Sequence, residues 1–147
     1  MKIYLAADHG GFELKEEIKK YLIEKGLDID DCGNFKKEDR DDYPDWISKA
    51  AEKVSNAQGS LGIVFGRSGA GECIVANKFK NVRAVAVFNR ESAKLAREKN
   101  DANIMCLGAD FVDLEEAKEF TDAFINTPFS NEERHVRRIE KIKQLED

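Results

Sequence analysis

The stretch LGIVFGRSGAGE, residues 61–72, is the part of the chain around which the rest is organised. It opens with an apolar run typical of a buried strand and continues with glycines that permit a tight turn. Residues 72–78 have the composition of the first turns of a helix. A strand, a glycine loop and a helix start gather unpaired backbone N–H groups at one point, which attracts an anion. Unusually, a carboxylate, Glu72, lies at the same place.

Strand-like and helix-like segments alternate on both sides of this stretch. We expect strands at residues 2–7, 27–32, 61–65, 82–88 and 103–107, with the polar second strand near a sheet edge. We expect helices at 12–25, 44–57, 72–78, 91–99, 114–126 and a last one ending near 145, which a capping box formed by Ser130 and Glu133 would start. Strands separated by helices indicate βαβ crossovers. The expected fold is α/β, a mainly parallel sheet covered on both faces, in one domain over residues 1–147.

Composition limits the classes of function. With 147 residues, 41% hydrophobic content and a net charge of −5, the sequence is typical of a compact globular protein. The negative charge argues against nucleic acid as a partner, and no apolar run is long enough to span a membrane. The N-terminus has no signal-peptide pattern, and the three cysteines lack metal-ligand spacing. We therefore expect a cytoplasmic protein with reduced thiols.

Ligands of open parallel sheets bind outside the carboxyl ends of the strands. That rule selects Asp8 and His9 after the first strand and residues 66–72 after the third. The glycines at 66, 69 and 71 match neither a dinucleotide fingerprint nor a nucleotide-triphosphate loop. This disfavours a nucleotide or flavin domain. The alternative that the loop is only a turn stays open.

Glu72 has two interpretations. It could simply complement the positive end of the helix dipole. It could instead be a general base beside an oxyanion site, which is what proton abstraction next to a carbonyl requires. A base with a pKa near neutrality would need partial burial to offset the helix dipole.

The two histidines of the chain are both candidates for the site. His9 directly follows a strand, a location that favours function over a merely satisfied polar group. A metal site is disfavoured because Asp8 and His9 have no clustered partners in the sequence. On a helix, Arg134, His135 and Arg138 fall within one arc of about 100°, which suits a phosphate or carboxylate. A solvated basic face explains this cluster equally well.

Several stretches together resemble the ribose-5-phosphate isomerase B family, which includes galactose-6-phosphate isomerase subunits. They are residues 7–15, 42–44, 66–78, 100–103 and 134–138, spread in order over essentially the whole chain. The resemblance implies a five-stranded parallel α/β/α sandwich of Rossmann-like form. It also implies a homodimer, or a dimer of dimers, with sites between subunits. The implied activity is aldose–ketose isomerisation of a sugar phosphate, as in pentose phosphate metabolism, without metal or other cofactor.

The resemblance also assigns roles to residues. Glu72 would be the base that moves a proton between C1 and C2 through a cis-enediolate. Ser68 and the N–H groups of Gly69, Ala70 and Gly71 would form the anion hole. Asp8, His9 and Asn100 would hold substrate hydroxyls, Tyr43 would line the pocket, and Arg134, His135 and Arg138 would bind the phosphate. In one branch of the family a cysteine just after the third strand is the base. Here that position is Gly66, so the chain resembles the glutamate-base branch.

Two positions depart from the family pattern. Lys99 stands where the family usually has a ring-opening histidine, and Asp110 where it usually has a phosphate-binding arginine. Arg67, where the family often has glycine, could restore a donor, so Arg67 and Lys99 count as candidate substrate-binding residues. A substrate that is already open-chain, such as a tetrose 4-phosphate, would need no ring opening. We therefore expect retained base chemistry on a sugar phosphate of the ribose 5-phosphate and ribulose 5-phosphate type, with a tetrose 4-phosphate or another sugar phosphate as the altered substrate that the two departures allow. The alternative is a non-catalytic sugar-phosphate-binding or regulatory subunit.

Overall fold

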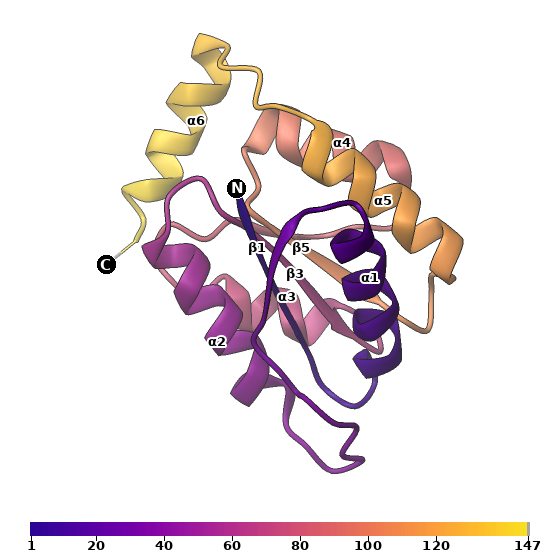
Figure 1. Cartoon of the computed structure of the whole chain (residues 1–147). Helices are drawn as coiled ribbons and strands as arrows, with labels where there is room; N and C mark the ends of the chain where they lie inside the picture. Colours follow the sequence, from indigo (N-terminus) through magenta and orange to yellow (C-terminus); the bar gives the residue numbers. More distant parts are fainter. Residues whose placement is uncertain (147) are drawn as a thin grey trace.

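The five strands form a single parallel sheet. The computed structural model describes residues 1–146, and Figure 1 shows its sheet between layers of helices. Over these residues the strands are β1 (Lys2–Ala7), β2 (Asp28–Asp31), β3 (Leu61–Gly66), β4 (Ala84–Ala86) and β5 (Ile104–Gly108). Their order is β2-β1-β3-β5-β4, and every neighbouring pair is parallel. The predicted parallel α/β/α sandwich is confirmed, and the polar strand β2 lies at an edge.

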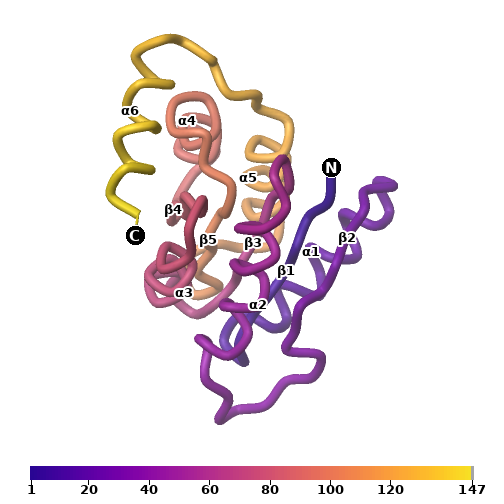
Figure 2. Tube along the Cα trace, turned by 90° about the vertical axis from the view of Figure 1, so that its left-hand side faces the viewer, coloured from indigo at the N-terminus to yellow at the C-terminus, as the bar shows by residue number. Residues whose placement is uncertain are grey.

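Helices cover both faces of the sheet. They are α1 (Phe12–Glu24), α2 (Tyr43–Asn56), α3 (Ala70–Ala76), α4 (Arg90–Asn100), α5 (Leu114–Asn126) and α6 (Glu133–Lys143). One core cluster joins the sheet to α1, α4 and α5, and the other joins it to α2 and α3. Helix α6 lies outside these layers beside α4, on the β4 side of the sheet (Figure 2). None of the helices within residues 1–146 is long and apolar enough to cross a membrane.

The central strands are buried on both faces because helices cover each side. Alternate residues of one strand therefore enter different cores. Ile63 and Phe65 of β3 face α1 and α5, whereas Val64 faces α2. Because β1, β3 and β5 run parallel, their carboxyl ends lie at one edge of the sheet, from which the connecting loops emerge.

Most of the expected elements begin or end within one or two residues of the observed ones, and β4 covers only Ala84–Ala86 of the expected strand 82–88. Two helix starts differ for a reason that the structure shows. Helix α3 begins at Ala70 rather than at residue 72, because Gly69 adopts a φ of 82° and caps it. The prediction that a capping box formed by Ser130 and Glu133 starts the last helix is wrong. Helix α6 begins at Glu133 and has no side-chain cap among residues 1–146. The Ser130 hydroxyl, which would have formed the box, instead lies 2.7 Å from Nδ1 of His135.

Candidate active site

The carboxylate of Glu72 is a buried acidic group at the carboxyl edge of the sheet. It lies in the first turn of α3 and is only 4% exposed. Burial raises the pKa of Glu72, and the nearby negative charge of Asp8 raises it further. The backbone N–H groups of Glu72 and Gly69 act in the opposite direction without cancelling the effect of burial. Glu72 thus has the partial burial that a general base requires.

The glycine loop is fixed to the end of the neighbouring strand. The N–H groups of Ala109 and Asp110 donate to the carbonyl oxygens of Gly66 and Arg67, at 2.8 and 3.0 Å. Gly108 lies so close to Ser68 that an added Cβ would come within 2.5 Å of its carbonyl carbon. Two adjacent backbones can approach this closely only because glycine lacks a side chain. The loop is therefore held in one position relative to Glu72.

Ser68 and Tyr43 border the same loop. The Ser68 hydroxyl accepts a hydrogen bond of 3.2 Å from the N–H of Ala70, which keeps the hydroxyl at the start of α3. The ring of Tyr43 lies over Gly71, where an added Cβ would be 3.0 Å from the phenol oxygen. Both predicted residues thus lie next to the turn that carries Glu72.

Asp8 and His9 lie at the end of β1, and each is held by hydrogen bonds. Oδ1 of the buried Asp8 accepts from the N–H groups of Gly10 and Gly11, at 3.0 and 3.3 Å. Oδ1 of Asp41 accepts from the backbone N–H of His9 at 3.0 Å and lies 2.7 Å from its Nδ1.

The expectation that Asp8 and His9 have no clustered partner was wrong, because the connection after β2 brings Asp41 back to the site. Ligand atoms of Asp8, His9 and Asp41 lie within 4.8 Å of one another, so the three could in principle hold a metal ion. The hydrogen bond between His9 and Asp41 already uses two of these atoms. Sequence reasoning missed Asp41 because it is one of several similar acidic residues in a charged loop.

Arg67 and Asp110, the unusual pair of the sequence, lie together. Nε of Arg67 is 3.4 Å from Oδ2 of Asp110, and both side chains are mostly exposed. The aliphatic part of Arg67 covers Gly10, where an added Cβ would be 2.1 Å from its Cγ. The positive charge of Arg67 is therefore directed at Asp110.

The other predicted site residues lie at the opposite end of the sheet. Lys99 and Asn100 are exposed at the end of α4, just before the start of β5. Helix α6 is tied to the same end, because the N–H of Ser130 donates to the carbonyl of Glu98 at 2.9 Å. Arg134 and Arg138 are exposed there, whereas His135 is buried with its ring against Ser130. Figure 1 shows α6 far from the turn between β1 and α1.

The candidate site therefore consists of two separate groups of residues within one chain. The first group contains Asp8, His9, Tyr43, Arg67, Ser68, Gly69, Ala70, Gly71 and Glu72, at the carboxyl edge of the sheet. The second group contains Lys99, Asn100, Arg134, His135 and Arg138, at the amino edge. A single copy of the chain does not bring the two groups together. The roles assigned to these residues stay predictions.

Comparisons with known proteins agree over nearly the whole chain. Residues 3–142 match the family described as Ribose/Galactose Isomerase. The chain is 42% identical to ribose-5-phosphate isomerase B of Mycobacterium leprae over 146 residues, covering 99% of this chain and 90% of that protein. It is 39% identical to the Escherichia coli K12 protein of the same name over 145 residues, with 99% and 96% covered. The crystal structure of ribose-5-phosphate isomerase B from Mycoplasma genitalium with bound ribulose-5-phosphate superposes with a TM-score of 0.94 at 38% identity, covering 97% of this chain and 94% of that one.

Proposed function

The chain belongs to the Ribose/Galactose Isomerase family and is a sugar-phosphate aldose–ketose isomerase, and we propose that Glu72 is its catalytic base. The observation that carries this proposal is the burial of Glu72 beside a fixed glycine loop. A carboxylate with a raised pKa gains a proton more readily, which suits a group that must both remove and return one.

The reaction is a transfer of one proton between two neighbouring carbons. Glu72 takes the proton from C2 of the aldose, and the electron pair of that bond moves to form the C1–C2 double bond of a cis-enediolate. The charge that develops on oxygen is stabilised by N–H donors of the loop and by Ser68. Protonated Glu72 then returns the proton to C1, while the hydroxyl proton on O2 passes to O1. This leaves a carbonyl at C2 and a hydroxyl at C1, which is the ketose. No net oxidation occurs, because one carbon is oxidised while its neighbour is reduced.

We propose that the complete site forms between two copies of the chain. Arg134 and Arg138 are exposed on α6, which is tied to the end of α4 at the edge of the sheet opposite Glu72. They therefore suit the phosphate of a substrate bound to a second copy. The exposed apolar side chains of Ile74 on α3 and Phe88 after β4 support an interface near the glycine loop. A homodimer of this kind has two equivalent sites.

The substrate is proposed to be a phosphorylated sugar of the ribose 5-phosphate and ribulose 5-phosphate type, or a shorter relative. The pairing of Arg67 with Asp110 favours a difference from the usual pentose, because it leaves no unpaired cation at this place. Lys99 is normally charged and is a poor acid–base group for ring opening. A tetrose 4-phosphate cannot form a furanose ring and would need no such group. The cytoplasmic location likewise stays a proposal.

A screen of tetrose, pentose and hexose phosphates in heavy water tests these proposals. We expect exchange of the C2 hydrogen and isomerisation of at least one substrate, with loss of both in Glu72→Gln. Glu115→Gln, which changes an exposed glutamate on α5, is the matched control and should behave like the wild type. Binding without exchange would instead support a non-catalytic sugar-phosphate-binding subunit. Turnover of ribose 5-phosphate far above that of a tetrose 4-phosphate would refute the proposal of an altered substrate, but not the proposal that Glu72 is the base.

A further inference from the structure

The carboxylate of Asp41 holds His9 from both its backbone and its ring. The side chain of Asp41 is only 4% exposed, and its Oδ1 lies 3.0 Å from the backbone nitrogen of His9 and 2.7 Å from Nδ1. The His9 side chain is 30% exposed at the carboxyl edge of the sheet. A buried carboxylate therefore fixes an imidazole that still faces the solvent.

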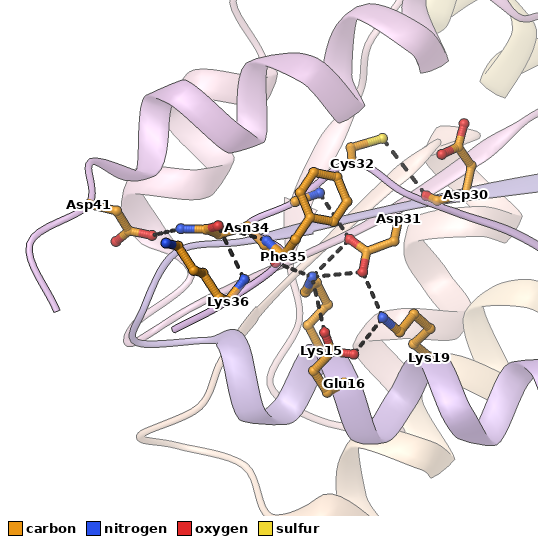
Figure 3. Close-up of polar contacts among 11 residues, drawn as sticks. Lys15, Glu16, Lys19, Asp30, Asp31, Cys32, Asn34, Phe35, Lys36 and Asp41 are labelled. Carbon is orange, nitrogen blue, oxygen red and sulfur yellow. Dashed lines mark hydrogen bonds and ion pairs between the residues drawn. The ribbon is translucent and has the colours of Figure 1, made fainter. Parts of the chain in front are cut away.

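Asp41 is itself held by a chain of hydrogen bonds that begins in the protein interior. Nδ2 of Asn34 donates to the second carboxylate oxygen of Asp41 at 3.2 Å. The carbonyl of Asn34 accepts from Nζ of Lys15 at 2.6 Å, and Lys15 is fully buried against Asp31. Figure 3 shows this sequence of contacts, from Lys15 through Asn34 to Asp41. The position of Asp41 is thus set by the core, although it belongs to a long polar loop.

This arrangement determines which nitrogen of His9 is available to a ligand. Nδ1 faces Asp41 and donates its hydrogen to the carboxylate, so Nε2 lies on the opposite side of the ring. Among residues 1–146, Nε2 has no hydrogen-bond partner. A ring held in this way presents Nε2 alone. Its charge then decides whether it accepts or donates a hydrogen bond.

The surroundings of His9 favour the charged ring. The hydrogen bond to Asp41 raises the pKa of His9 most, burial opposes it, and the negative charges of Asp8, Asp41 and Asp39 raise it further. The cation Arg67 packs against Gly10 from the next loop, but it pairs with Asp110. The acidic residues around His9 therefore all favour protonation of its ring.

We propose that Asp41 is a positioning residue of the substrate site, which holds His9 as a cationic donor whose Nε2–H binds an anionic oxygen of the sugar phosphate. The identity of the ligand rests on the proposed function. The hydrogen bonds by which Asp41 holds His9 do not depend on that function. The role of His9 as a charged donor makes substrate affinity depend on a residue that does not touch the substrate.

Titration by NMR tests the hold on His9 without any substrate. The chain has only two histidines, so the ring signals of His9 can be assigned with His9→Gln and followed from pH 5 to pH 9. In Asp41→Asn we expect the pKa of His9 to fall by about one unit. Asp39→Asn removes the same formal charge from the same loop and is the matched control, with an expected fall of less than about 0.3 units. Equal shifts in the two variants, or none, would overturn the proposal.

Kinetics test the consequence for the substrate. At a pH above the pKa that NMR gives for His9 in the wild type, Asp41→Asn should raise KM for the best sugar phosphate of the screen by up to about tenfold. The reason is that a fall of about one unit in the pKa leaves about ten times fewer charged rings, and a neutral ring binds an anionic oxygen more weakly. The change in kcat should be less than about twofold, and the difference in KM should shrink as the pH falls below the two pKa values measured by NMR, where both proteins hold a protonated ring. Equal losses at all pH values would indicate a purely structural role and overturn the proposal.

The two readouts separate this inference from the proposed function. If no sugar phosphate is isomerised but the NMR shift occurs, the proposed function fails and the hold of Asp41 on His9 stands. If isomerisation occurs without the shift, the inference fails alone. Should Asp41→Asn lose the dispersed spectrum of a folded protein, Asn34→Ala releases Asp41 from one partner and should lower the pKa of His9 by a smaller amount in the same direction.

Discussion

The carboxylate of Glu72 fills the space that a side chain at Gly66 would need. A Cβ added to Gly66 would lie 1.8 Å from Oε1 and 2.2 Å from the carboxylate carbon of Glu72. Real atoms cannot approach so closely, so the two positions compete for one place at the end of β3. A side chain at residue 66 and the carboxylate of Glu72 therefore exclude each other at this point.

Gly66→Ala should therefore displace the carboxylate of Glu72, the proposed base. We expect a loss of kcat of at least about tenfold and a fall in the free energy of unfolding of about 1–3 kcal/mol from overpacking. The double variant Gly66→Ala/Glu72→Ala removes the collision, so the alanine at 66 should cost much less stability there than in the wild type. Denaturant unfolding of the wild type, of Gly66→Ala, of Glu72→Ala and of the double variant gives the coupling free energy between the two positions. Additive effects would show that the two groups do not compete.

Glu72→Gln should affect activity and stability in opposite directions. Loss of the base should lower kcat about 10²–10⁴-fold. The pKa of Glu72 is raised by burial and by Asp8, so the folded state binds its proton more tightly than the unfolded state. Stability from this group is fully present below the unfolded pKa and is lost as the pH rises through the folded pKa. The variant should thus be more stable than the wild type at pH 8, and the difference should vanish near pH 4. A more stable wild type at pH 8 would contradict this.

The fold was largely predictable from the sequence, because apolar runs and helical spacing repeat along the whole chain. The central strand, the edge position of β2 and the glycine loop all follow from local composition. Element ends were less predictable. The start of α3 depends on the positive φ of Gly69, and the start of α6 depends on a contact between Ser130 and His135, neither of which has a local signal.

The site was predictable only where residues directly follow a strand. Asp8, His9 and Glu72 have that location, and the parallel sheet brings them to one edge. Asp41 has no such signal, because its place depends on the path of a polar loop that Asn34 and Lys15 hold. The separation of Arg134 from Glu72 depends on where α6 packs, which hydrophobic spacing does not determine.

Lys15→Met should destabilise the fold strongly. Lys15 is fully buried, and its ammonium group donates to Asp31 at 2.8 Å and to the carbonyl of Asn34 at 2.6 Å (Figure 3). Removal of one partner leaves buried polar groups without compensation, for which we expect a loss of about 3 kcal/mol in denaturant unfolding. Lys19→Met removes a partly exposed lysine from the same carboxylate and should cost less than about 1 kcal/mol. Equal losses would show that burial of Lys15 is not the cause.

The same cluster should give the protein a characteristic acid sensitivity. Burial alone would raise the pKa of Asp31, but hydrogen bonds from Lys15, Lys19 and the N–H of Gly33 outweigh it and lower the pKa. Stability from Asp31 is then present above its unfolded pKa and is lost as the pH falls through the folded pKa. In the wild type the free energy of unfolding should be larger at pH 6 than at pH 3. Asp31→Asn should make this difference smaller. An unchanged difference would mean that other carboxylates dominate acid unfolding.

Two inactive variants should restore activity when they are combined, if the complete site forms between two copies. Glu72→Gln removes the base, and Arg134→Ala/Arg138→Ala removes the proposed phosphate donors from the opposite end of the chain. In a mixed dimer one site receives both defects and the other receives neither. Random re-association gives about half mixed dimers, so about a quarter of the wild-type activity should return. Each variant refolded with itself is the control. If the mixture stays as inactive as its components, the two groups serve no common site.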